Sequence, residues 1–179
     1  MRSIMLAKRR AMPAHVRERL SASICSRLLG MPQVAEAAAI GIYMPFENEV
    51  DVDALLMAFF ANGKKVFVPV MHRNGGMKFA VLKSRKDTAV GYGSIRIPRS
   101  LSFAGSMTIG VFVVPGIAFD RRGFRIGFGG GHYDRFFSRG SGAVKIGVAY
   151  DFQVVGEVDA KAHDVRMDFV VTEKRIIKT

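Results

Sequence analysis

Apolar residues recur at helical spacing in several parts of the chain. In the segment 15–29, one helical face is formed by Val16, Leu20, Ile24 and Leu28. Pro13 suits the first turn of this helix, and Gly30 suits its end. The same kind of pattern predicts helices over residues 4–11, 15–29, 52–61 and 132–137. Asp51 is expected to cap the third of these helices.

Short apolar runs between the expected helices predict β-strands. They span residues 38–43, 65–70, 77–82, 109–114, 144–149 and 169–172, the last being the final element. The polar segment 83–106 is expected to be mostly loop with short strands. Strands that alternate with helices indicate an α/β fold with a mostly parallel sheet, covered by helices on both faces. No composition shift marks a boundary, so residues 1–179 are expected to form a single domain.

The charge of the chain is strongly positive. Its 179 residues contain 27 Lys and Arg against 15 Asp and Glu, which gives a net charge of +12. Such a balance suits an anionic partner, either nucleic acid or a nucleotide with a polyanionic small molecule. The basic residues are scattered and form no RNA-binding or zinc-finger pattern, which favours a basic enzyme over a nucleic-acid module. We therefore do not expect nucleic acid as a partner.

Cysteine content and hydropathy indicate a cellular compartment. Cys25 is the only cysteine, so no internal disulfide is possible, as is typical of a reducing cytosol. Its place in an amphipathic helix pattern indicates a buried structural thiol. No apolar run reaches transmembrane length, and the first residues lack the apolar core of a signal peptide. We expect a cytoplasmic protein that acts as a monomer without a membrane partner.

A glycine run after a buried strand is the most informative stretch of the chain. The strand residues 111–114 are followed by Pro115-Gly116, by Arg125 and then by the run 127–131, which opens a helix. Backbone N–H groups at such a helix start bind phosphate, and Arg125 adds a charged donor. The run matches neither the dinucleotide fingerprint nor a P-loop, so a tight loop without a ligand is the alternative. In parallel sheets, ligands bind beyond the carboxyl ends of strands, where this loop is expected.

A longer stretch around the glycine run resembles the signature of an enzyme family. Its residues are Pro115-Gly116-Ile117-Ala118-Phe119-Asp120 and Gly123-x-Arg125-Ile126-Gly127-x-Gly129-Gly130-Gly131-His132-Tyr133-Asp134-Arg135. In order, spacing and residue type it looks like the signature of the 5-formyltetrahydrofolate cyclo-ligases, also called 5,10-methenyltetrahydrofolate synthetases. The segments 43–51 and 162–173 resemble two further family motifs. The resemblance implies an α/β domain of the kind shared with ribose-5-phosphate isomerase and CoA-transferase folds.

The resemblance also implies a reaction and its ATP site. The reaction is the ATP-dependent closure of 5-formyltetrahydrofolate to 5,10-methenyltetrahydrofolate, with release of ADP and phosphate. Arg125 and Tyr133 are expected at the reacting groups, although core packing is the alternative for Tyr133. ATP binding is assigned to Arg2, Arg125, Ile126, Gly127, Phe128, Gly129, Gly130, Gly131, His132 and Tyr133.

Folate binding is likewise assigned from the resemblance, to Met44, Glu49, Phe128, Gly129, Gly130, Gly131 and His132. A carboxylate such as Glu49 is suited to accept from pterin N–H groups, and its alternative is a solvated loop charge. Met44 and Phe46 would line the same pocket, and core packing explains them equally well. His132 stands where the family often has Tyr, which puts its folate contact in question.

Asp134 and Asp164 match the family's magnesium ligands. Two carboxylates together with waters and phosphate oxygens form an ordinary magnesium site. The alternatives are a solvated helix residue or a pair with Arg135 for Asp134, and a turn or helix-cap residue for Asp164. A zinc site of His132, His163 and Asp134 follows no known ligand spacing.

The first helix is basic. Lys8, Arg9 and Arg10 would ordinarily form a solvated helix face. In the family, a Lys-x-x-x-Arg pair on this helix reaches the ATP phosphates. Of that pair the chain has only the Arg, which is Arg2. Lys8 or Arg9 is a candidate to take part of the role of the missing lysine.

Two other functions remain as alternatives to an ATP-dependent cyclo-ligase. One is a non-catalytic nucleotide- or RNA-binding module of the same fold, suggested by the net charge of +12. The other is a sugar-phosphate isomerase or transferase, suggested by fold analogy alone. The joint presence of Arg125, Asp134 and Asp164 favours the enzyme, because RNA binding needs no pair of magnesium ligands.

Overall fold

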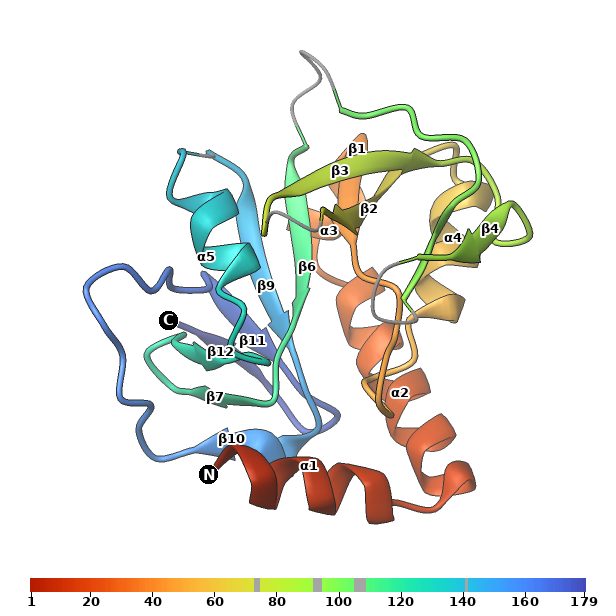
Figure 1. Cartoon of the computed structure of the whole chain (residues 1–179). Coiled ribbons are helices and arrows are strands. Elements are labelled where there is room, and N and C mark those ends of the chain that lie inside the picture. The colour runs from red at the N-terminus through yellow and green to blue at the C-terminus, as the bar shows by residue number, and fades with distance from the viewer. Residues whose placement is uncertain (73–74, 92–94, 105–108, 141) are drawn as a thin grey trace.

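The computed structural model describes residues 1–72, 75–91, 95–104, 109–140 and 142–179 (Figure 1). Within these residues the helices are α1 (Arg2–Ala11), α2 (Ala14–Leu29), α3 (Pro32–Glu36), α4 (Asp53–Ala61) and α5 (His132–Phe137), with a 3₁₀ turn at Asp151–Gln153. Pro13 directly precedes α2, and Gly30 follows its last residue. The Asp51 carboxylate accepts a hydrogen bond of 2.9 Å from the amide of Asp53 at the start of α4. The predicted helices and their boundary signals are therefore confirmed to within a few residues.

The main sheet has seven strands in the order β12-β11-β9-β6-β1-β2-β3. They are β1 (Ala39–Ile42), β2 (Lys65–Met71), β3 (Met77–Leu82), β6 (Val111–Pro115), β9 (Val144–Val148), β11 (Phe169–Val171) and β12 (Ile176–Lys178). The inner pairings β2-β1, β1-β6, β6-β9 and β9-β11 are parallel. The edge strands β3 and β12 pair antiparallel to their neighbours. The prediction of a mostly parallel α/β sheet is confirmed.

Two smaller sheets complete the fold. One has the order β10-β7-β8, formed by β10 (Val154–Val155), β7 (Ala118–Asp120) and β8 (Arg125–Ile126). The other pairs β4 (Thr88–Val90) with β5 (Arg96–Pro98) inside the segment expected to be mostly loop. Positions 92–94 and 105–106 of that segment lie outside the described residues.

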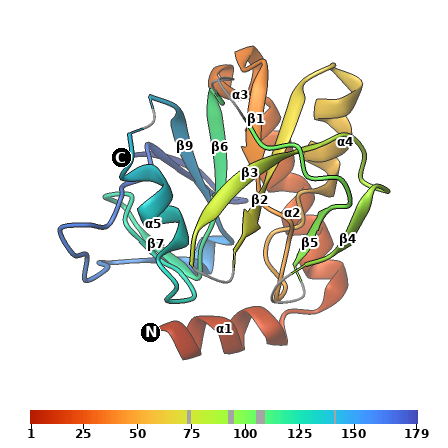
Figure 2. The same cartoon turned by 45° about the horizontal axis from the view of Figure 1, so that its top comes forward.

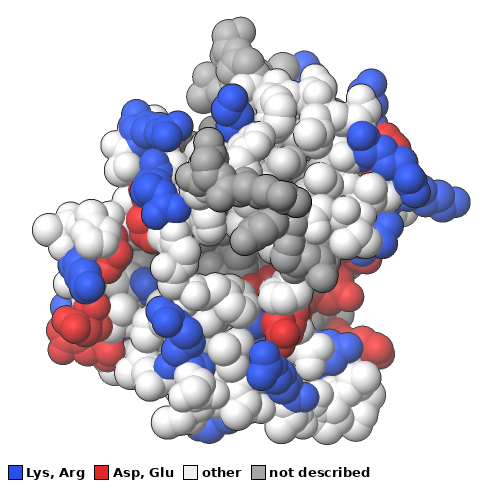
Figure 3. All heavy atoms as spheres, in the orientation of Figure 1, with Lys and Arg blue, Asp and Glu red and all other residues white. Residues whose placement is uncertain are grey.

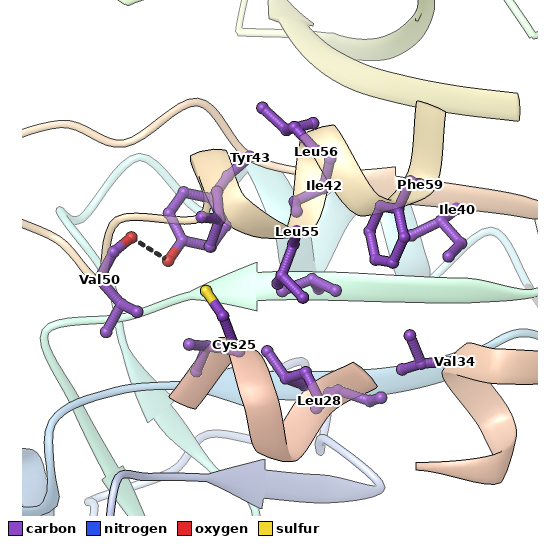
Figure 4. Packing of buried hydrophobic residues seen from close by; sticks show 14 of the residues in the cluster. Cys25, Leu28, Val34, Ile40, Ile42, Tyr43, Val50, Leu55, Leu56 and Phe59 are labelled. Atoms are coloured by element: carbon purple, nitrogen blue, oxygen red, sulfur yellow. Dashed lines mark hydrogen bonds between the residues drawn. The ribbon is translucent and has the colours of Figure 1, made fainter. Parts of the chain in front are cut away.

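One face of the main sheet is covered by α2, α3 and α4. Alternate residues of the central strands point to this side, among them Ile40 of β1 and Val113 of β6. They pack against apolar residues of the helices, including Leu28, Leu55 and Phe59 (Figure 4). Apolar residues at helical spacing and alternating residues of the strands thus meet in one core, which fixes how the helices lie on the sheet.

The opposite face of the sheet carries a layer of aromatic rings and is covered by α5. The ring centroid of Phe112 in β6 lies 4.9 Å from that of Phe79 in β3 and 5.1 Å from that of Phe137 in α5. Gly147 in β9 leaves room for the ring of Phe119, because a Cβ at this position would overlap that ring. Helices therefore cover both faces of the sheet, as predicted.

The sequence interpretation was wrong at the end of the chain and incomplete after β6. The strand expected over 169–172 is not the final element, because β12 follows it and pairs antiparallel with β11. The residues after Gly116, for which no strand is predicted from the sequence, form the β7–β8 hairpin. These strands of two or three residues are too short to give a periodic pattern, so tertiary pairing decides them.

The carboxyl ends of β1 and β6 lie at the same edge of the sheet, because the two strands are parallel neighbours. Helix α1 crosses this edge, apart from the packed helices of the sheet (Figures 1 and 2). Among the described residues, no helix has the length and apolar character needed to cross a membrane. On the face in Figure 3, Lys and Arg side chains are spread over several places, with acidic side chains between some of them.

Candidate functional site

The glycine loop between β8 and α5 has the backbone geometry of an anion-binding loop. Gly129 and Gly131 have φ values of 99° and 59°, which residues other than glycine rarely adopt. Within the described part of the chain, the amides from Phe128 to Gly131 donate no recorded hydrogen bond. Gly131 precedes the first residue of α5. The loop therefore presents unpaired N–H groups at a helix start, as the sequence predicts.

Arg2 of α1 lies against this loop. A Cβ added to Gly129 would lie 3.5 Å from Nη1 of Arg2. The Arg2 side chain is exposed, so its guanidinium remains available to a bound anion. Arg2 and the glycine loop, which are far apart in the sequence and are both assigned to ATP from the resemblance, are thus neighbours in space.

Arg125 is not a solvated loop residue. Its side chain is 5% exposed, and its Nη2 lies 3.0 Å from Oδ1 of Asp134. Its Nη1 donates to the carbonyl oxygen of Val165 at 3.2 Å, and its guanidinium carbon lies 5.6 Å from the Tyr133 ring centroid. Burial lowers the pKa of Arg125, and the carboxylate of Asp134 acts in the opposite direction. Arg125 therefore joins the hairpin, α5 and the C-terminal segment at one point.

The two predicted metal ligands come from segments that touch. The amide of Val165, the residue after Asp164, donates to Oδ1 of Asp134 at 3.1 Å. Oδ2 of Asp134 has no recorded hydrogen bond to a described residue. Asp164 accepts from the amide of Lys161 at 2.8 Å, so the turn role considered for it is present. The pairing of Asp134 with Arg135 is wrong, because Arg125 is its partner.

A buried carboxylate holds the hairpin that carries Arg125. Asp120 is fully buried and accepts hydrogen bonds from the amides of Arg122, Phe124 and Val158. Burial opposes its ionisation, but these donors and the Arg122 side chain lower its pKa overall. The sequence shows an acid in a loop, and the structure assigns it to the support of the site.

Glu49 lies in a tight loop after β1. It is only 7% exposed, and its Oε2 accepts from the amide of Phe46 at 3.1 Å. Glu47 and Asn48, just before it, have left-handed φ values of 51° and 56°, a backbone conformation that costs free energy in residues other than glycine. Burial raises the pKa of Glu49 to about 7, although Arg9 acts to lower it. The alternative of a solvated loop charge is wrong for Glu49.

The burial of Arg9 is the feature of the site that the sequence interpretation missed, although Arg9 was a candidate to take part of the role of the missing lysine. It was expected on a solvated helix face, but it is 1% exposed and is the one buried residue of α1. Its Nη1 lies 4.0 Å from Oε1 of Glu49. A run of three basic residues contains no signal that singles out the middle one. Its burial depends on how α1 meets the loop after β1, which is a tertiary contact.

The other predicted site residues differ in how they are placed. Tyr133 packs on Arg125 and against the aromatic layer, so the packing role considered for it is present. The rings of Phe46 and Phe128 lie 5.9 Å apart. Met44 is buried within the core cluster. His132 turns away to the carbonyl oxygen of Gly75, 3.0 Å from its Nδ1.

These groups form two neighbouring regions with different chemistry. One has unpaired backbone donors, Arg2 and Arg125, and two carboxylates, which together suit a phosphate group and a hard cation. The other has the buried carboxylate of Glu49 and the rings of Phe46 and Phe128, which suit a flat polar heterocycle. Among the described residues, no group of three or more His, Cys, Asp and Glu side chains could hold a metal ion. A cation here would therefore need further ligands, such as waters or phosphate oxygens.

A model of the 5-formyltetrahydrofolate cyclo-ligase family matches residues 1–173. The chain belongs to this family of enzymes. It is 31% identical to the 5,10-methenyltetrahydrofolate synthetase of Aquifex aeolicus, whose solution structure superposes with a TM-score of 0.87 over 99% of this chain and 90% of the other. The 5-formyltetrahydrofolate cyclo-ligases of Mycolicibacterium smegmatis and Escherichia coli K12 are 29% and 26% identical, covering 98% and 94% of this chain and 93% and 96% of their own.

The resemblance noticed in the sequence is thereby confirmed, and the cyclo-ligase family accounts for the fold. The glycine loop, Arg125 and Asp134 carry the stretch on which that resemblance rests. In the structure, this stretch forms β7, β8, the glycine loop and α5, and α5 packs on one face of the main sheet.

Titration of Glu49 is expected to make the cyclo-ligase fold less stable at higher pH. The pKa of Glu49 is raised by burial from 4.5 to about 7. The folded state then binds more protons than the unfolded state over this range, so the free energy of unfolding falls as pH rises through about 7. The contribution is up to about 3 kcal/mol. Urea unfolding of the wild type and of Glu49→Gln between pH 5 and 8 measures it, because the variant should lose this part of the slope. Parallel pH dependences for the two proteins would contradict the buried titration.

Proposed function

We propose that this chain converts 5-formyltetrahydrofolate to 5,10-methenyltetrahydrofolate in a reaction that consumes ATP and requires Mg²⁺. The observation that carries the proposal is the adjacency of two regions at one sheet edge: a glycine loop with unpaired amides beside Arg2 and Arg125, and the buried Glu49. The names of the family and of the solved relative supply the folate. The first region supplies groups suited to a triphosphate.

The chemistry of this reaction explains why such a site needs no side-chain nucleophile. A formamide carbonyl is a poor electrophile, because the nitrogen lone pair is delocalised into it. The formyl oxygen attacks the γ-phosphorus and ADP leaves. The amine N10 then attacks the activated carbon and loses its proton, and phosphate departs with the former formyl oxygen. Positioning and charge stabilisation dominate phosphoryl transfers of this kind.

The ATP role is proposed for the glycine loop and for the two arginines beside it. Backbone N–H groups from Gly127 to Gly131 would donate to phosphate oxygens. Arg2 would add a charge from α1, and Arg125 would stabilise the transferred group with its planar donors. Ile126 and Phe128 belong to the same backbone. His132, because it bonds to Gly75, would contribute through its main chain.

Mg²⁺ is proposed to bind between the phosphates, Asp134 and Asp164. The residues fit this ion in part: hard carboxylate oxygens are present, and Oδ2 of Asp134 has no recorded partner among described residues. When bound, the ion would offset negative charge on the phosphate oxygens. The Arg125–Asp134 ion pair holds both side chains in place until the phosphate and the cation arrive. Each charge would then gain a partner of opposite sign from the ligand.

The folate role is proposed for the region around Glu49. Its carboxylate would accept from the pterin N–H groups, and Phe46 and Phe128 would pack on the ring system. Met44 lies in the core below this loop, so its part in folate binding would be to support the loop. Tyr133 would lie between the two substrates. We expect the chain to work as a monomer.

An RNA- or nucleotide-binding module without catalysis is the second candidate, motivated by the net charge of +12. The assay that separates the candidates mixes the purified chain with ATP, MgCl₂ and 5-formyltetrahydrofolate and follows the ultraviolet absorbance of the methenyl product. Product is expected only when all three are present. A folded protein that binds RNA or nucleotide tightly but forms no product would support the second candidate and contradict the first.

A further inference from the structure

Arg9 and Glu49 form a buried pair of opposite charges at the site. Among the described residues, Arg9, Glu49 and Asp120 are buried charged residues, and the side chain of Arg125, which is paired with Asp134, is buried as well. Asp120 is surrounded by hydrogen-bond donors, whereas Arg9 and Glu49 retain unused capacity. Burying ionised groups without full pairing is costly, so such groups are typical of binding and catalytic sites.

The hydrogen bonds of Arg9 leave one of its nitrogens without a partner. Its Nε donates to the carbonyl oxygen of Glu47 at 2.8 Å, and its Nη1 reaches that of Gly116 at 3.4 Å. Its Nη2 is buried and has no hydrogen-bond partner. The guanidinium carbon lies 5.8 Å from the ring centroid of Phe128. An unused donor thus lies between the Glu49 loop and the aromatic residue of the glycine loop.

Anchoring of α1 does not account for this arrangement. The neighbouring Arg10 already joins α1 to the same loop through a partly exposed ion pair with Glu47, at 2.7 Å. An exposed pair has little desolvation cost, whereas Arg9 is fully desolvated and only partly bonded. A ligand that accepts a hydrogen bond from Nη2 would complete its coordination.

We propose, on the basis of the folate function above, that Arg9 determines pterin specificity by donating from Nη2 to the C4 carbonyl oxygen while Glu49 accepts from N3–H and the 2-amino group. The pterin edge presents an acceptor next to two donors in one plane. Arg9 and Glu49 present a donor next to an acceptor, with Nη1 and Oε1 4.0 Å apart. The two edges are complementary. A 4-amino analogue would place a donor against Arg9 and leave Nη2 unpaired.

The ATP phosphates are the competing ligand for Arg9. Arg2 and Arg9 are seven residues apart, and so lie on the same helix face about 10 Å apart along the axis. Arg2 faces Gly129, whereas Arg9 faces the carboxylate of Glu49. A carboxylate beside Arg9 would repel a triphosphate. The positions therefore favour phosphate at Arg2 and the pterin at Arg9.

Steady-state kinetics of Arg9 variants test the proposal. Arg9→Met keeps the buried stem but removes the donors, and Arg9→Lys keeps the charge but removes the planar fork. Arg9→Met is expected to raise KM for 5-formyltetrahydrofolate by about 10- to 100-fold, as for one lost buried hydrogen bond to a charged group. KM for ATP should stay within about twofold. Arg10→Met, on the same helix, should leave both values within about twofold.

Inhibition by the 4-amino-4-deoxy analogue of 5-formyltetrahydrofolate separates specificity from structural support. The wild type should bind this analogue far more weakly than the substrate. Arg9→Met should lower the ratio of the inhibition constant of the analogue to KM for the substrate by about fivefold or more. If Arg9→Met does not fold, Arg9→Lys should show the same changes in KM for 5-formyltetrahydrofolate and in binding of the analogue, with smaller magnitude.

The outcomes distinguish this inference from the function on which it rests. Methenyl product from the wild type, with an unchanged folate KM and an unchanged analogue ratio in both Arg9 variants, would overturn only the role of Arg9. A rise in KM for ATP, with KM for 5-formyltetrahydrofolate unchanged, would assign Arg9 to the phosphates and would also overturn its proposed role in pterin specificity. Absence of product from the folded wild type would refute the proposed function, and the pterin assignment with it.

Discussion

Replacement of Arg125 by alanine is expected to lower kcat/KM for the cyclo-ligase reaction by about 100-fold or more. In the proposed reaction, the guanidinium would offset charge that develops on the transferred phosphoryl group, and lost contacts of this kind cost about that factor. Most of the loss should appear in kcat, because under the proposal the unpaired amides of the glycine loop would still bind ground-state phosphates. Initial rates from methenyl absorbance, with ATP and folate varied separately, measure both constants.

The Arg125 experiment needs a stability control, because the side chain is 5% exposed and paired with Asp134. Its removal should reduce the free energy of unfolding by about 1–3 kcal/mol, as for a partly buried charge left without its partner. Arg121→Ala is the matched control, since Arg121 is an exposed arginine of the same hairpin. Wild-type kinetics in a folded Arg125→Ala protein would remove Arg125 from the reaction.

Replacement of either predicted metal ligand is expected to raise the Mg²⁺ concentration at half-maximal rate by about tenfold or more. A neutral amide is a weaker ligand for a hard cation than a carboxylate, so Asp134→Asn and Asp164→Asn should both show this effect. Asp134→Asn should also loosen Arg125, which loses its carboxylate partner. Titration of the initial rate with MgCl₂ at saturating ATP and folate measures the shift.

The double variant tests whether the two aspartates hold the same ion. If they do, Asp134→Asn with Asp164→Asn should be little worse than the more damaged single variant. Asp159→Asn is a matched control, because Asp159 is exposed in the same C-terminal segment. Additive effects of the two replacements would mean that Asp134 and Asp164 serve different sites.

The main elements of the fold could be predicted because they carry periodic patterns. Residues that are buried in the structure form the apolar face of α2 and the apolar runs of β1, β2, β6 and β9. Strands β7, β8, β10 and β12 could not be predicted, since their two or three residues show no period and do not stand out as a separate apolar run. Their pairing depends on the main sheet, and on buried groups such as Asp120, whose partners are distant in the sequence.

The candidate site was predictable where local backbone chemistry defines it. A glycine run before a helix indicates unpaired amides, and the structure has them between Phe128 and Gly131. The pairing of Arg125 with Asp134 and the burial of Arg9 beside Glu49 were not predictable. Both depend on segments brought together only by the fold: β8 with α5, and α1 with the loop after β1.

The fate of the formyl oxygen tests the proposed reaction most directly. The purified chain would be mixed with ATP, MgCl₂ and 5-formyltetrahydrofolate labelled with ¹⁸O in the formyl group, and the released phosphate would be analysed by mass spectrometry. The account predicts one methenyl product for each phosphate, and one ¹⁸O atom in that phosphate, because the formyl oxygen leaves bonded to phosphorus. Absence of product, or product accompanied by unlabelled phosphate, would contradict it.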